Sequence, residues 1–238
     1  MVEEQVSSEH QPIGHIRYIG FDMDGTLRDS LSEYTRLFGG LMHDKYNIAA
    51  EEAEVHFVNT AGQPTLDQIS TLLEKHGITI SPDEAFKEGN RVASYLGEHS
   101  DAPSFSEVPD TLKDLKERGY CIFVSSGQQE EMVKGYLEKS GLMLYVDFFA
   151  GIRPEEPEFE KGEPHFREAA RHFGVPFDIF VKEVVFIGDT PTDMKVANDS
   201  GIAAVARSGI NTEKVLLDSG AKFVLSDFSN LSTVLLTL

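Results

Sequence analysis

The second half of the chain, from about residue 107, alternates short apolar runs with helical segments that stop at a glycine. The apolar runs have the composition of buried strands and lie at 120–124, 146–150, 184–187, 203–205 and 223–225. Helical segments flank them at 112–118, 130–140, 166–173 and 194–200, and an earlier apolar run lies at 16–21. Strands that alternate with helices form right-handed crossover units. The pattern therefore predicts an α/β fold whose parallel sheet is covered by helices on both faces.

Residues 30–106 show a different pattern, without a convincing strand. Their apolar residues recur at helical spacing in three pieces, at Tyr34, Leu37, Phe38, Leu41 and Met42, at Leu66, Ile69, Leu72 and Leu73, and at Phe86, Val92, Ala93, Tyr95 and Leu96. A turn-rich loop at 59–65 joins the first two pieces. The pattern predicts a small helical bundle inserted into the α/β domain. Its aromatic residues, Phe86 included, are expected in the core of the bundle because they fall on helical stripes.

These patterns predict the domain boundaries. The α/β core is expected at 16–29 and 107–238, the helical insert at 30–106, and a loose polar tail at 1–15. The tail resembles neither a signal peptide nor a membrane anchor, and no other window has the length of a membrane span. We expect a cytoplasmic protein, as a monomer or a weak homodimer.

The composition narrows the possible partners. The chain has 238 residues and a formal net charge of −19, which argues against nucleic-acid and anionic-membrane partners. An anionic substrate would need a local cation, supplied by a metal and one or two lysines. The single cysteine, Cys121, cannot form a disulfide within the chain and is expected as a small buried side chain. The eight histidines show no zinc-site spacing and are expected mostly on the surface or in helices.

Four polar stretches follow the apolar runs of the α/β region. They are the acidic pair Asp22 and Asp24, the stretch Ser125-Ser126-Gly127, the segment around Lys161, and the stretch Gly188-Asp189-Thr190-Pro191-Thr192-Asp193. The carboxyl ends of parallel strands lie along one edge of a sheet, so the first, second and fourth stretches should meet there. Carboxylates at the end of a buried strand need a cation or a pairing partner nearby. The sequence therefore predicts a charged site at this edge.

The acidic residues fit the roles of a phosphoryl-transfer site. The Asp22 carboxylate suits a nucleophile that forms an aspartyl-phosphate. Asp24 suits the acid that protonates the leaving oxygen and the base that then activates water. Asp22 and Asp189 offer the hard oxygen ligands that Mg²⁺ prefers.

The other stretches suit the phosphate. The Ser125 hydroxyl and the backbone N–H groups of Ser126 and Gly127, expected at a helix start, suit phosphate oxygens. Lys161 would offset the negative charge of nucleophile and substrate, and is expected both to bind phosphate and to assist catalysis.

Plainer interpretations exist for each stretch alone. The acidic pair also fits an ordinary turn, and Lys161 also fits an exposed lysine. Thr190 and Pro191 form a good helix start, so Asp193 is expected to cap that helix beside the site rather than to bind metal. Thr26 is likewise expected to support the site from beside it and not to bind metal. The joint occurrence, in order and at strand ends, is much more specific than any one stretch.

Together the four stretches resemble the motifs of the haloacid dehalogenase-like hydrolase superfamily, from about residue 16 to the C-terminus. The stretches that carry the resemblance are Phe21-Asp22-Met23-Asp24-Gly25-Thr26-Leu27, Val124-Ser125, Lys161-Gly162-Glu163-Pro164 and Gly188-Asp189-Thr190-x-x-Asp193. The helical insert lies where phosphoglycolate-phosphatase-like and β-phosphoglucomutase-like members carry a helical cap. The resemblance implies a Rossmann-like core, Mg²⁺, an aspartyl-phosphate intermediate, and the backbone carbonyl of Asp24 as a third metal ligand beside Asp22 and Asp189.

The resemblance separates some branches of the family. Dehalogenases lack the second aspartate of the first motif, so Asp24 argues against them. Phosphonatases use a cap lysine, and Lys45, Lys75 and Lys87 fall in no motif of that kind. The resemblance predicts a Mg²⁺-dependent phosphatase of a small phosphorylated metabolite. A phosphosugar mutase has the same core motifs and stays an alternative, as does a non-catalytic regulatory binding protein.

Specificity is expected to depend on the cap. Arg28 stands where the family commonly has an apolar residue, at the start of the hinge toward the cap, and could face substrate or solvent. The loop around Gly62 and Gln63 could contact the leaving group or be an ordinary helix–helix turn. The sequence does not identify the substrate.

Overall fold

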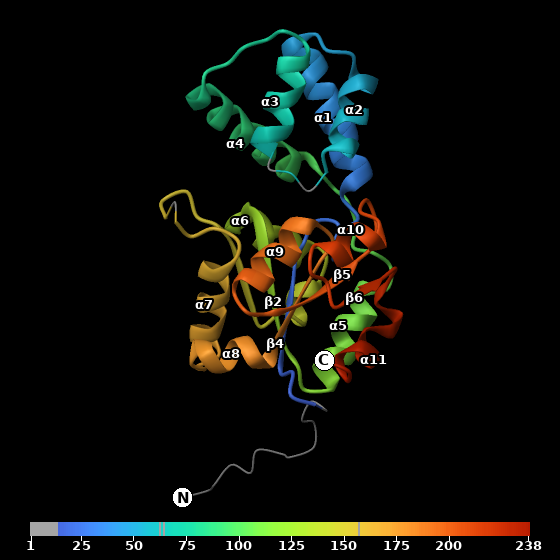
Figure 1. Ribbon diagram of the computed structural model, residues 1–238, viewed down its shortest axis with the longest axis vertical. Coiled ribbons are helices and arrows are strands. Elements are labelled where there is room, and N and C mark those ends of the chain that lie inside the picture. The colour runs from blue at the N-terminus through green and yellow to red at the C-terminus, as the bar shows by residue number, and fades with distance from the viewer. Residues whose placement is uncertain (1–13, 62, 64, 157) are drawn as a thin grey trace, which may run out of the picture.

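The computed structural model describes residues 14–61, 63, 65–156 and 158–238. At its centre is a six-stranded parallel sheet in the order β3-β2-β1-β4-β5-β6 (Figure 1). The strands are β1 (Tyr18–Phe21), β2 (Cys121–Gln129), β3 (Phe148–Ile152), β4 (Val184–Gly188), β5 (Ala203–Arg207) and β6 (Phe223–Leu225). The predicted Rossmann-like parallel sheet is confirmed. Because β1 lies between β2 and β4, the residues after it reach the middle of the sheet edge.

Helices cover both faces of the sheet. One face packs against α5 (Val108–Glu117), α6 (Glu130–Lys139) and α11 (Leu231–Leu235), with the short turns η1 (Leu142–Leu144) and η2 (Phe228–Asn230). The other packs against α7 (Glu163–His172), α8 (Phe177–Glu183), α9 (Pro191–Asp199) and α10 (Glu213–Asp218). Side chains of β1 alternate between these layers, with Ile19 and Phe21 on the α5 side and Tyr18 on the α7 side. This alternation produces two apolar cores, one on each face.

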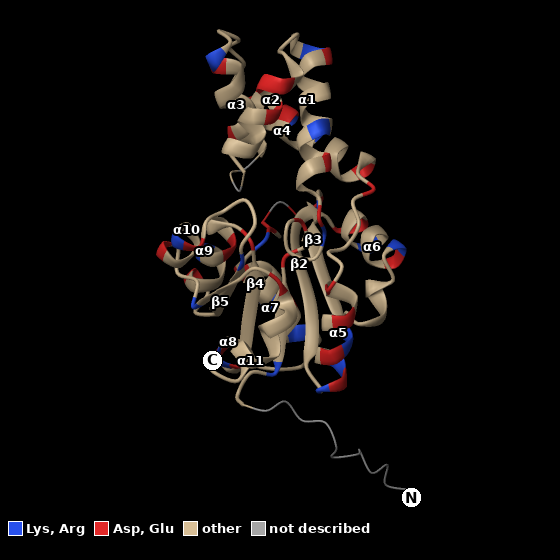
Figure 2. Ribbon diagram, turned by 90° about the vertical axis from the view of Figure 1, so that its right-hand side faces the viewer, with Lys and Arg blue, Asp and Glu red and all other residues tan. Residues whose placement is uncertain are grey.

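Four helices, which we call the cap, are inserted between β1 and α5. They are α1 (Leu31–Tyr46), α2 (Ala50–Asn59), α3 (Thr65–Lys75) and α4 (Pro82–His99). They enclose an apolar core of their own that includes Phe38, Met42 and Leu72. Two views at right angles place the cap beyond the carboxyl ends of the strands (Figures 1 and 2). Within the described residues, no helix combines the length and the apolarity that a membrane crossing needs.

Two chain segments connect the cap to the sheet, and they run side by side. The Asp29 N–H donates to the Pro103 carbonyl at 2.9 Å, and the Phe105 N–H donates to the Leu27 carbonyl at 3.1 Å. These hydrogen bonds join the segment that leaves the core to the one that returns. The cap is therefore attached through one narrow paired hinge.

The sequence analysis did not predict four of the described helices, α2, α8, α10 and α11. The apolar pattern of each is weak or short. In α2 only Ala53 and Phe57 are buried, while Val55 is exposed. In α10 only Leu216 is buried. One cap residue was also misplaced: Phe86 is 61% exposed and is not part of the cap core. The buried stripe of α4 runs through Ala85, Gly89, Val92 and Leu96, and Phe86 lies beside this stripe.

Strand β2 differs most from expectation. The prediction ended it at 124 and expected the backbone of Ser126 and Gly127 at a helix start, but the strand continues to Gln129. The helix predicted at 130–140 does begin at Glu130, as α6. The pairing of β2 with β3 shifts register between Ser125 and Gln129, as at a bulge. The polar stretch is therefore an irregular strand end. Cys121, at the start of β2, is only partly buried. The predicted tail at 1–15 lies almost entirely outside the described residues, and Gly62 lies outside them too.

Candidate active site

The acidic pair lies directly after the central strand. The Asp22 N–H continues the ladder by donating to the Ile187 carbonyl at 2.8 Å, while Met23 between the two aspartates is buried in the core. The chain then turns at Gly25, which has φ +82°, and a Cβ there would lie 2.2 Å from Asp189 Oδ2. A glycine is needed at this turn for its backbone conformation and for the close approach to Asp189.

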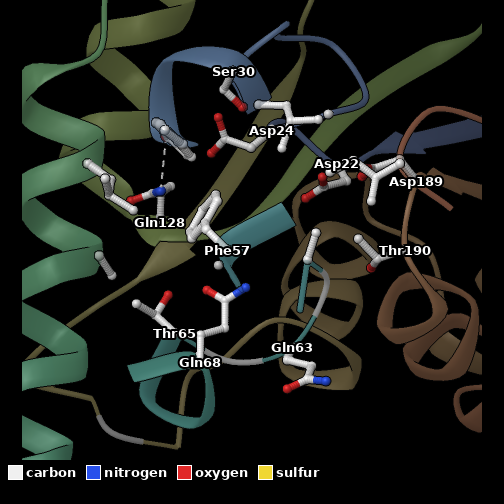
Figure 3. A pocket seen from close by; sticks show the side chains of 18 of the residues that line it. Asp22, Asp24, Ser30, Phe57, Gln63, Thr65, Gln68, Gln128, Asp189 and Thr190 are labelled. Atoms are coloured by element: carbon white, nitrogen blue, oxygen red, sulfur yellow. Dashed lines mark hydrogen bonds between the residues drawn. The ribbon is translucent and has the colours of Figure 1, made fainter. Parts of the chain in front are cut away.

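Three buried aspartates meet at this edge of the sheet. One carboxylate oxygen each from Asp22, Asp189 and Asp193 lies within 4.8 Å of the others. Lys161, from the loop before α7, bridges two of them, with its Nζ 2.5 Å from both Asp22 Oδ1 and Asp193 Oδ1. Figure 3 shows Asp22 and Asp189 side by side, with Asp24 close to them. The structure thus brings the first, third and fourth polar stretches together.

Burial governs the electrostatics of this cluster. Burial raises the pKa of Asp22 although Lys161 opposes the shift, and burial together with Asp193 and Asp22 raises the pKa of Asp189. Burial alone would lower the pKa of Lys161, but the charges of Asp193 and Asp22 raise it above its ordinary value. Three carboxylates therefore face one ammonium group. Such a set is stable in its charged form only with a further cation.

The donor set fits Mg²⁺. Asp22 and Asp189 each have one oxygen, Oδ2, that accepts no hydrogen bond from the described residues. Thr26 donates its hydroxyl to the other Asp189 oxygen at 3.3 Å. A carboxylate oxygen without a donor on each of two neighbouring aspartates, in a buried anionic site, is what a hard divalent cation requires. Asp22 and Asp189 could therefore hold the metal, with Thr26 orienting Asp189.

Asp193 has both of its oxygens engaged. Its Oδ2 accepts hydrogen bonds from the Thr190 N–H, the Thr190 hydroxyl and the Asp189 N–H, at 3.0, 2.6 and 3.2 Å. Thr190 is the N-cap of α9 and Pro191 opens the helix, as the sequence predicts. Since Oδ1 pairs with Lys161, Asp193 fixes both the helix start and the lysine.

Asp24 is more accessible than Asp22. Its side chain is 21% exposed, and its Oδ1 is buried with no hydrogen-bond partner among the described residues. The nearest cation is Arg28, with Nη1 at 3.7 Å from Asp24 Oδ1. An oxygen that accepts no hydrogen bond, beside the cavity that Asp22 also lines, can exchange a proton with a bound group.

Arg28 faces neither solvent nor the cavity that contains the aspartates, the two alternatives that the sequence left open. It is 4% exposed and donates to the Ser100 carbonyl at 2.6 Å, the Ala102 carbonyl at 3.4 Å and the Tyr34 hydroxyl at 3.2 Å. It does not line the cavity that contains the aspartates. Its donor-rich guanidinium instead ties both hinge segments together, because the hinge offers buried carbonyls that need donors.

The serine stretch divides into two parts. Ser125 is fully buried on the face of β2 that α7 covers, and its hydroxyl lies 2.9 Å from His165 Nδ1. Ser126 and Gly127 line the cavity, and Ser126 Oγ accepts from the Gln128 N–H at 3.1 Å. The α6 N-terminus begins only at Glu130. The helix start expected at Ser126 and Gly127 is therefore wrong, and the backbone that lines the cavity at these two residues belongs to the end of β2.

His165 is a residue that the sequence analysis missed. It is fully buried, and burial, followed by the charges of Lys161 and Arg153, lowers its pKa to about 4. The side chain is therefore neutral near pH 7 and holds the Ser125 hydroxyl. The sequence offered one signal for a buried histidine at this position. His165 directly follows Pro164 and lies on the inward stripe of α7 together with Phe166 and Ala169.

A cavity of about 230 Å³ lies between the cap and the sheet edge. Its core side is lined by Asp22, Asp24, Gly25, Ser30, Ser126, Gly127, Gln128, Asp189, Thr190 and Ile210, and its cap side by Leu31, Tyr34, Phe57, Ala61, Gln63, Thr65, Gln68, Ala93 and Leu96. Figure 3 shows Phe57, Thr65 and Gln68 facing the aspartates from the cap. Gln63 is therefore at the cavity, while its neighbour Gly62 lies outside the described residues.

Comparisons with known proteins agree with this geometry. The family model for haloacid dehalogenase-like hydrolases matches residues 16–201. A phosphoglycolate phosphatase of Haemophilus influenzae (strain 86-028NP) is 26% identical over 227 residues, covering 92% of this chain and 98% of the relative.

Solved structures share the fold. A predicted phosphoglycolate phosphatase from Haemophilus somnus 129pt has a TM-score of 0.73 at 22% identity, covering 93% of this chain and 99% of that one. A predicted β-phosphoglucomutase from Bacteroides vulgatus has a TM-score of 0.66 at 16% identity, covering 94% and 88%. The arrangement of sheet and cap is thus common to proteins described as phosphatases and as a mutase.

Proposed function

Because the chain belongs to the haloacid dehalogenase-like hydrolases, we propose that it is a Mg²⁺-dependent phosphatase of small phosphate monoesters that works through an aspartyl-phosphate on Asp22. One observation carries the proposal. The Asp22 carboxylate lies beside Asp189 and Lys161 at the floor of a cavity that also contains Asp24. A nucleophile, a metal ligand, a cation and a proton donor are then within reach of one phosphate group.

Asp22, Asp189 and the backbone carbonyl of Asp24 would hold the metal. When bound, Mg²⁺ would neutralise the carboxylates and stabilise the charge that develops on the phosphate. Lys161 would stabilise the same charge from the other side of Asp22, since Asp193 holds its ammonium group in place. The backbone at Ser126 and Gly127 would contact the phosphate oxygens, and His165 would hold the Ser125 hydroxyl behind them.

The first step transfers the phosphoryl group to Asp22. An Asp22 oxygen forms a bond to phosphorus while the ester P–O bond breaks, and Asp24 gives its proton to the leaving oxygen. In the second step the ionised Asp24 takes a proton from water, whose oxygen attacks the phosphorus and breaks the bond to Asp22. Inorganic phosphate leaves, and Asp24 is protonated again. The cap excludes other water from the cavity during this cycle.

The test compares wild-type protein with Asp22→Asn on p-nitrophenyl phosphate and Mg²⁺. We expect the variant to lose at least about a thousandfold in kcat, since an amide cannot act as the nucleophile. Asp218→Asn, an exposed carboxylate on α10 that pairs with Lys214, is the matched control and should keep full activity. Full activity of Asp22→Asn would overturn the proposed nucleophile.

The alternatives predict different products. A phosphosugar mutase would convert a sugar phosphate into an isomer without net release of phosphate. A regulatory binding protein would bind a phosphorylated ligand and release nothing. Phosphate release, measured together with chromatography of the remaining sugar phosphate, distinguishes all three.

A further inference from the structure

The two ends of the active-site cavity differ in charge. Every charged residue among the described residues that line it is an aspartate: Asp22, Asp24 and Asp189. No lysine, arginine or histidine appears among those lining residues. The cap side offers neutral polar groups, such as the amides of Gln63 and Gln68 and the hydroxyl of Thr65, beside the apolar side chain of Phe57 (Figure 3).

Basic side chains on the hinge, on the cap and at the sheet edge have partners of their own. The Arg28 guanidinium donates to two hinge carbonyls and to the Tyr34 hydroxyl. Its Nη1 also lies 3.7 Å from Asp24 Oδ1, and Arg28 does not line the cavity. His56 contacts the Gln68 carbonyl through Nε2 at 2.7 Å. On the cap, Lys45 pairs with Glu88 and Lys75 pairs with Glu52. Lys161 serves the phosphate end, between Asp22 and Asp193.

Gln68 adds a directional feature. Its side chain is 3% exposed, and its Nε2 donates to the Thr60 carbonyl at 2.8 Å. Since a carbonyl only accepts, this bond fixes the amide orientation. The Oε1 atom therefore presents an acceptor, with no donor among the described residues. A fixed acceptor suits a ligand hydroxyl and repels a ligand carboxylate.

We propose that the preferred substrate has an uncharged, hydroxyl-bearing leaving group, as in a small polyol or sugar phosphate, and that the cavity selects against a leaving group with a carboxylate. This inference rests on the phosphatase function proposed above. A carboxylate would lie near three aspartates and an acceptor amide, and the described residues that line the cavity include no cation to pair with it. Hydroxyl groups can donate to Gln68 Oε1 and accept from the neighbouring amides, while the C–H surface of the ligand packs on Phe57.

The inferred substrate preference differs from the substrate that appears in the names of several relatives. Several are named phosphoglycolate phosphatases, and phosphoglycolate carries a carboxylate on its leaving group. The inference therefore separates this chain from the substrate in the names of its relatives. Discrimination of this kind is set by the cavity lining and does not require any change in the catalytic residues.

The experiment uses a matched pair of esters, 2-phosphoglycolate and 2-hydroxyethyl phosphate, which differ by a carboxylate in place of a hydroxymethyl group. Phosphate release with Mg²⁺ gives kcat/KM for each, with p-nitrophenyl phosphate as the reference. We expect the hydroxyl ester to be favoured by about tenfold or more, as for a single unpaired polar contact. Equal values, or a preference for phosphoglycolate, would overturn the inference.

Charge variants at Gln63, which is exposed at the cavity rim, sharpen the test. Gln63→Arg should shift the ratio toward phosphoglycolate, and Gln63→Glu should shift it further toward the hydroxyl ester. Glu74→Gln changes the net charge by the same amount as Gln63→Arg but lies exposed at the far end of α3, so it should leave the ratio unchanged. A shift in Glu74→Gln equal to that in Gln63→Arg would mean that net charge, not the cavity, decides.

A binding measurement separates the two proposals. Calorimetric titration of Asp22→Asn with the same two esters gives their affinity ratio without turnover, and we expect the hydroxyl ester to bind more tightly. Hydrolysis of p-nitrophenyl phosphate with a preference for phosphoglycolate would overturn only the leaving-group inference. Absence of hydrolysis of all three esters would overturn the proposed function, and the leaving-group inference would fall with it.

Discussion

The core side and the cap side of the active-site cavity are built in opposite ways. On the core side, buried charges hold one another: Lys161 joins Asp22 to Asp193, and Thr26 donates to Asp189. On the cap side, neutral side chains from several helices face the cavity, and the Gln68 amide is oriented by its hydrogen bond to the Thr60 carbonyl. The charged residues are thus concentrated at the sheet edge, whereas the part of the cavity that would face a leaving group is shaped by how the cap helices pack.

Substitution of the proton-transfer residue should produce the largest effect. We expect Asp24→Asn to lower kcat by about 100- to 10,000-fold, because an amide cannot give a proton to the leaving oxygen or take one from water. Steady-state phosphate release measures this loss. Asp29→Asn changes an exposed carboxylate five residues along the same segment and should stay close to wild type. Unchanged turnover in Asp24→Asn would remove the acid–base role from the core side.

The second-largest effect is expected from the loss of Arg28, which lies in the hinge between the cap and the core. Arg28→Leu leaves the buried carbonyls of Ser100 and Ala102 without a donor, so we expect a loss of about 2–4 kcal/mol in the free energy of unfolding. Urea denaturation measures it. Arg28→Lys keeps the charge without the planar fork and should lose less. A loss below that of an exposed control, Arg36→Leu, would contradict the structural role.

The metal should stabilise the core side in a pH-dependent way. Burial raises the pKa of Asp22 and of Asp189, so the folded state binds their protons more tightly than the unfolded chain. Their contribution to stability is therefore present below the ordinary aspartate value of 3.8 and is lost as the pH rises through the raised values. Mg²⁺ should oppose this loss, by up to about 2.7 kcal/mol at a hundredfold excess over its Kd.

Thermal melts with and without Mg²⁺ at acidic and mildly alkaline pH measure this effect. The increase in Tm should be larger at the higher pH. Asp189→Asn should remove most of the increase, and Asp218→Asn should keep it. An equal increase at both pH values would show that the aspartate cluster is not the site of the metal.

The smallest effect should come from the histidine behind the phosphate site. His165→Ala removes the partner of the Ser125 hydroxyl, and we expect KM to rise by a few-fold, about 1 kcal/mol, with a smaller change in kcat. His165→Asn can place a polar atom near Nδ1 and should recover most of the loss. His172→Ala, on the exposed end of the same helix, is the control. A rise in KM that His165→Asn does not reverse would indicate a packing role alone.

The core side could be predicted from sequence because its geometry is local. Asp22 and Asp24 follow a buried strand, and parallel strands must end at one edge, so Asp189 had to lie nearby. The family, the fold class and the hydrolase class are confirmed. The capping role of Asp193 followed from the helix-start pattern and is borne out by the hydrogen bonds to Thr190.

Long-range packing explains what could not be predicted. The contact between Ser125 and His165 depends on α7 covering one face of β2, which no spacing reveals. The approach of Phe57 and Gln68 to the aspartates depends on the packing of α2 and α3 over the sheet edge. Arg28 could not be placed because its two carbonyl acceptors, in Ser100 and Ala102, lie more than 70 residues away along the chain.

Chemical trapping of the intermediate is the most direct test of whether Asp22 forms an aspartyl-phosphate. Wild-type protein and Asp24→Asn are mixed with a phosphate ester and Mg²⁺, quenched in acid, and digested for peptide mass spectrometry. We expect one phosphorylated peptide, the one that contains Asp22, with a phosphate that hydroxylamine removes. We expect a larger amount in Asp24→Asn, whose second step lacks its base. A phosphate found on Ser125 or Ser126, or on no residue while phosphate is still released, would contradict the assignment of Asp22 as the nucleophile.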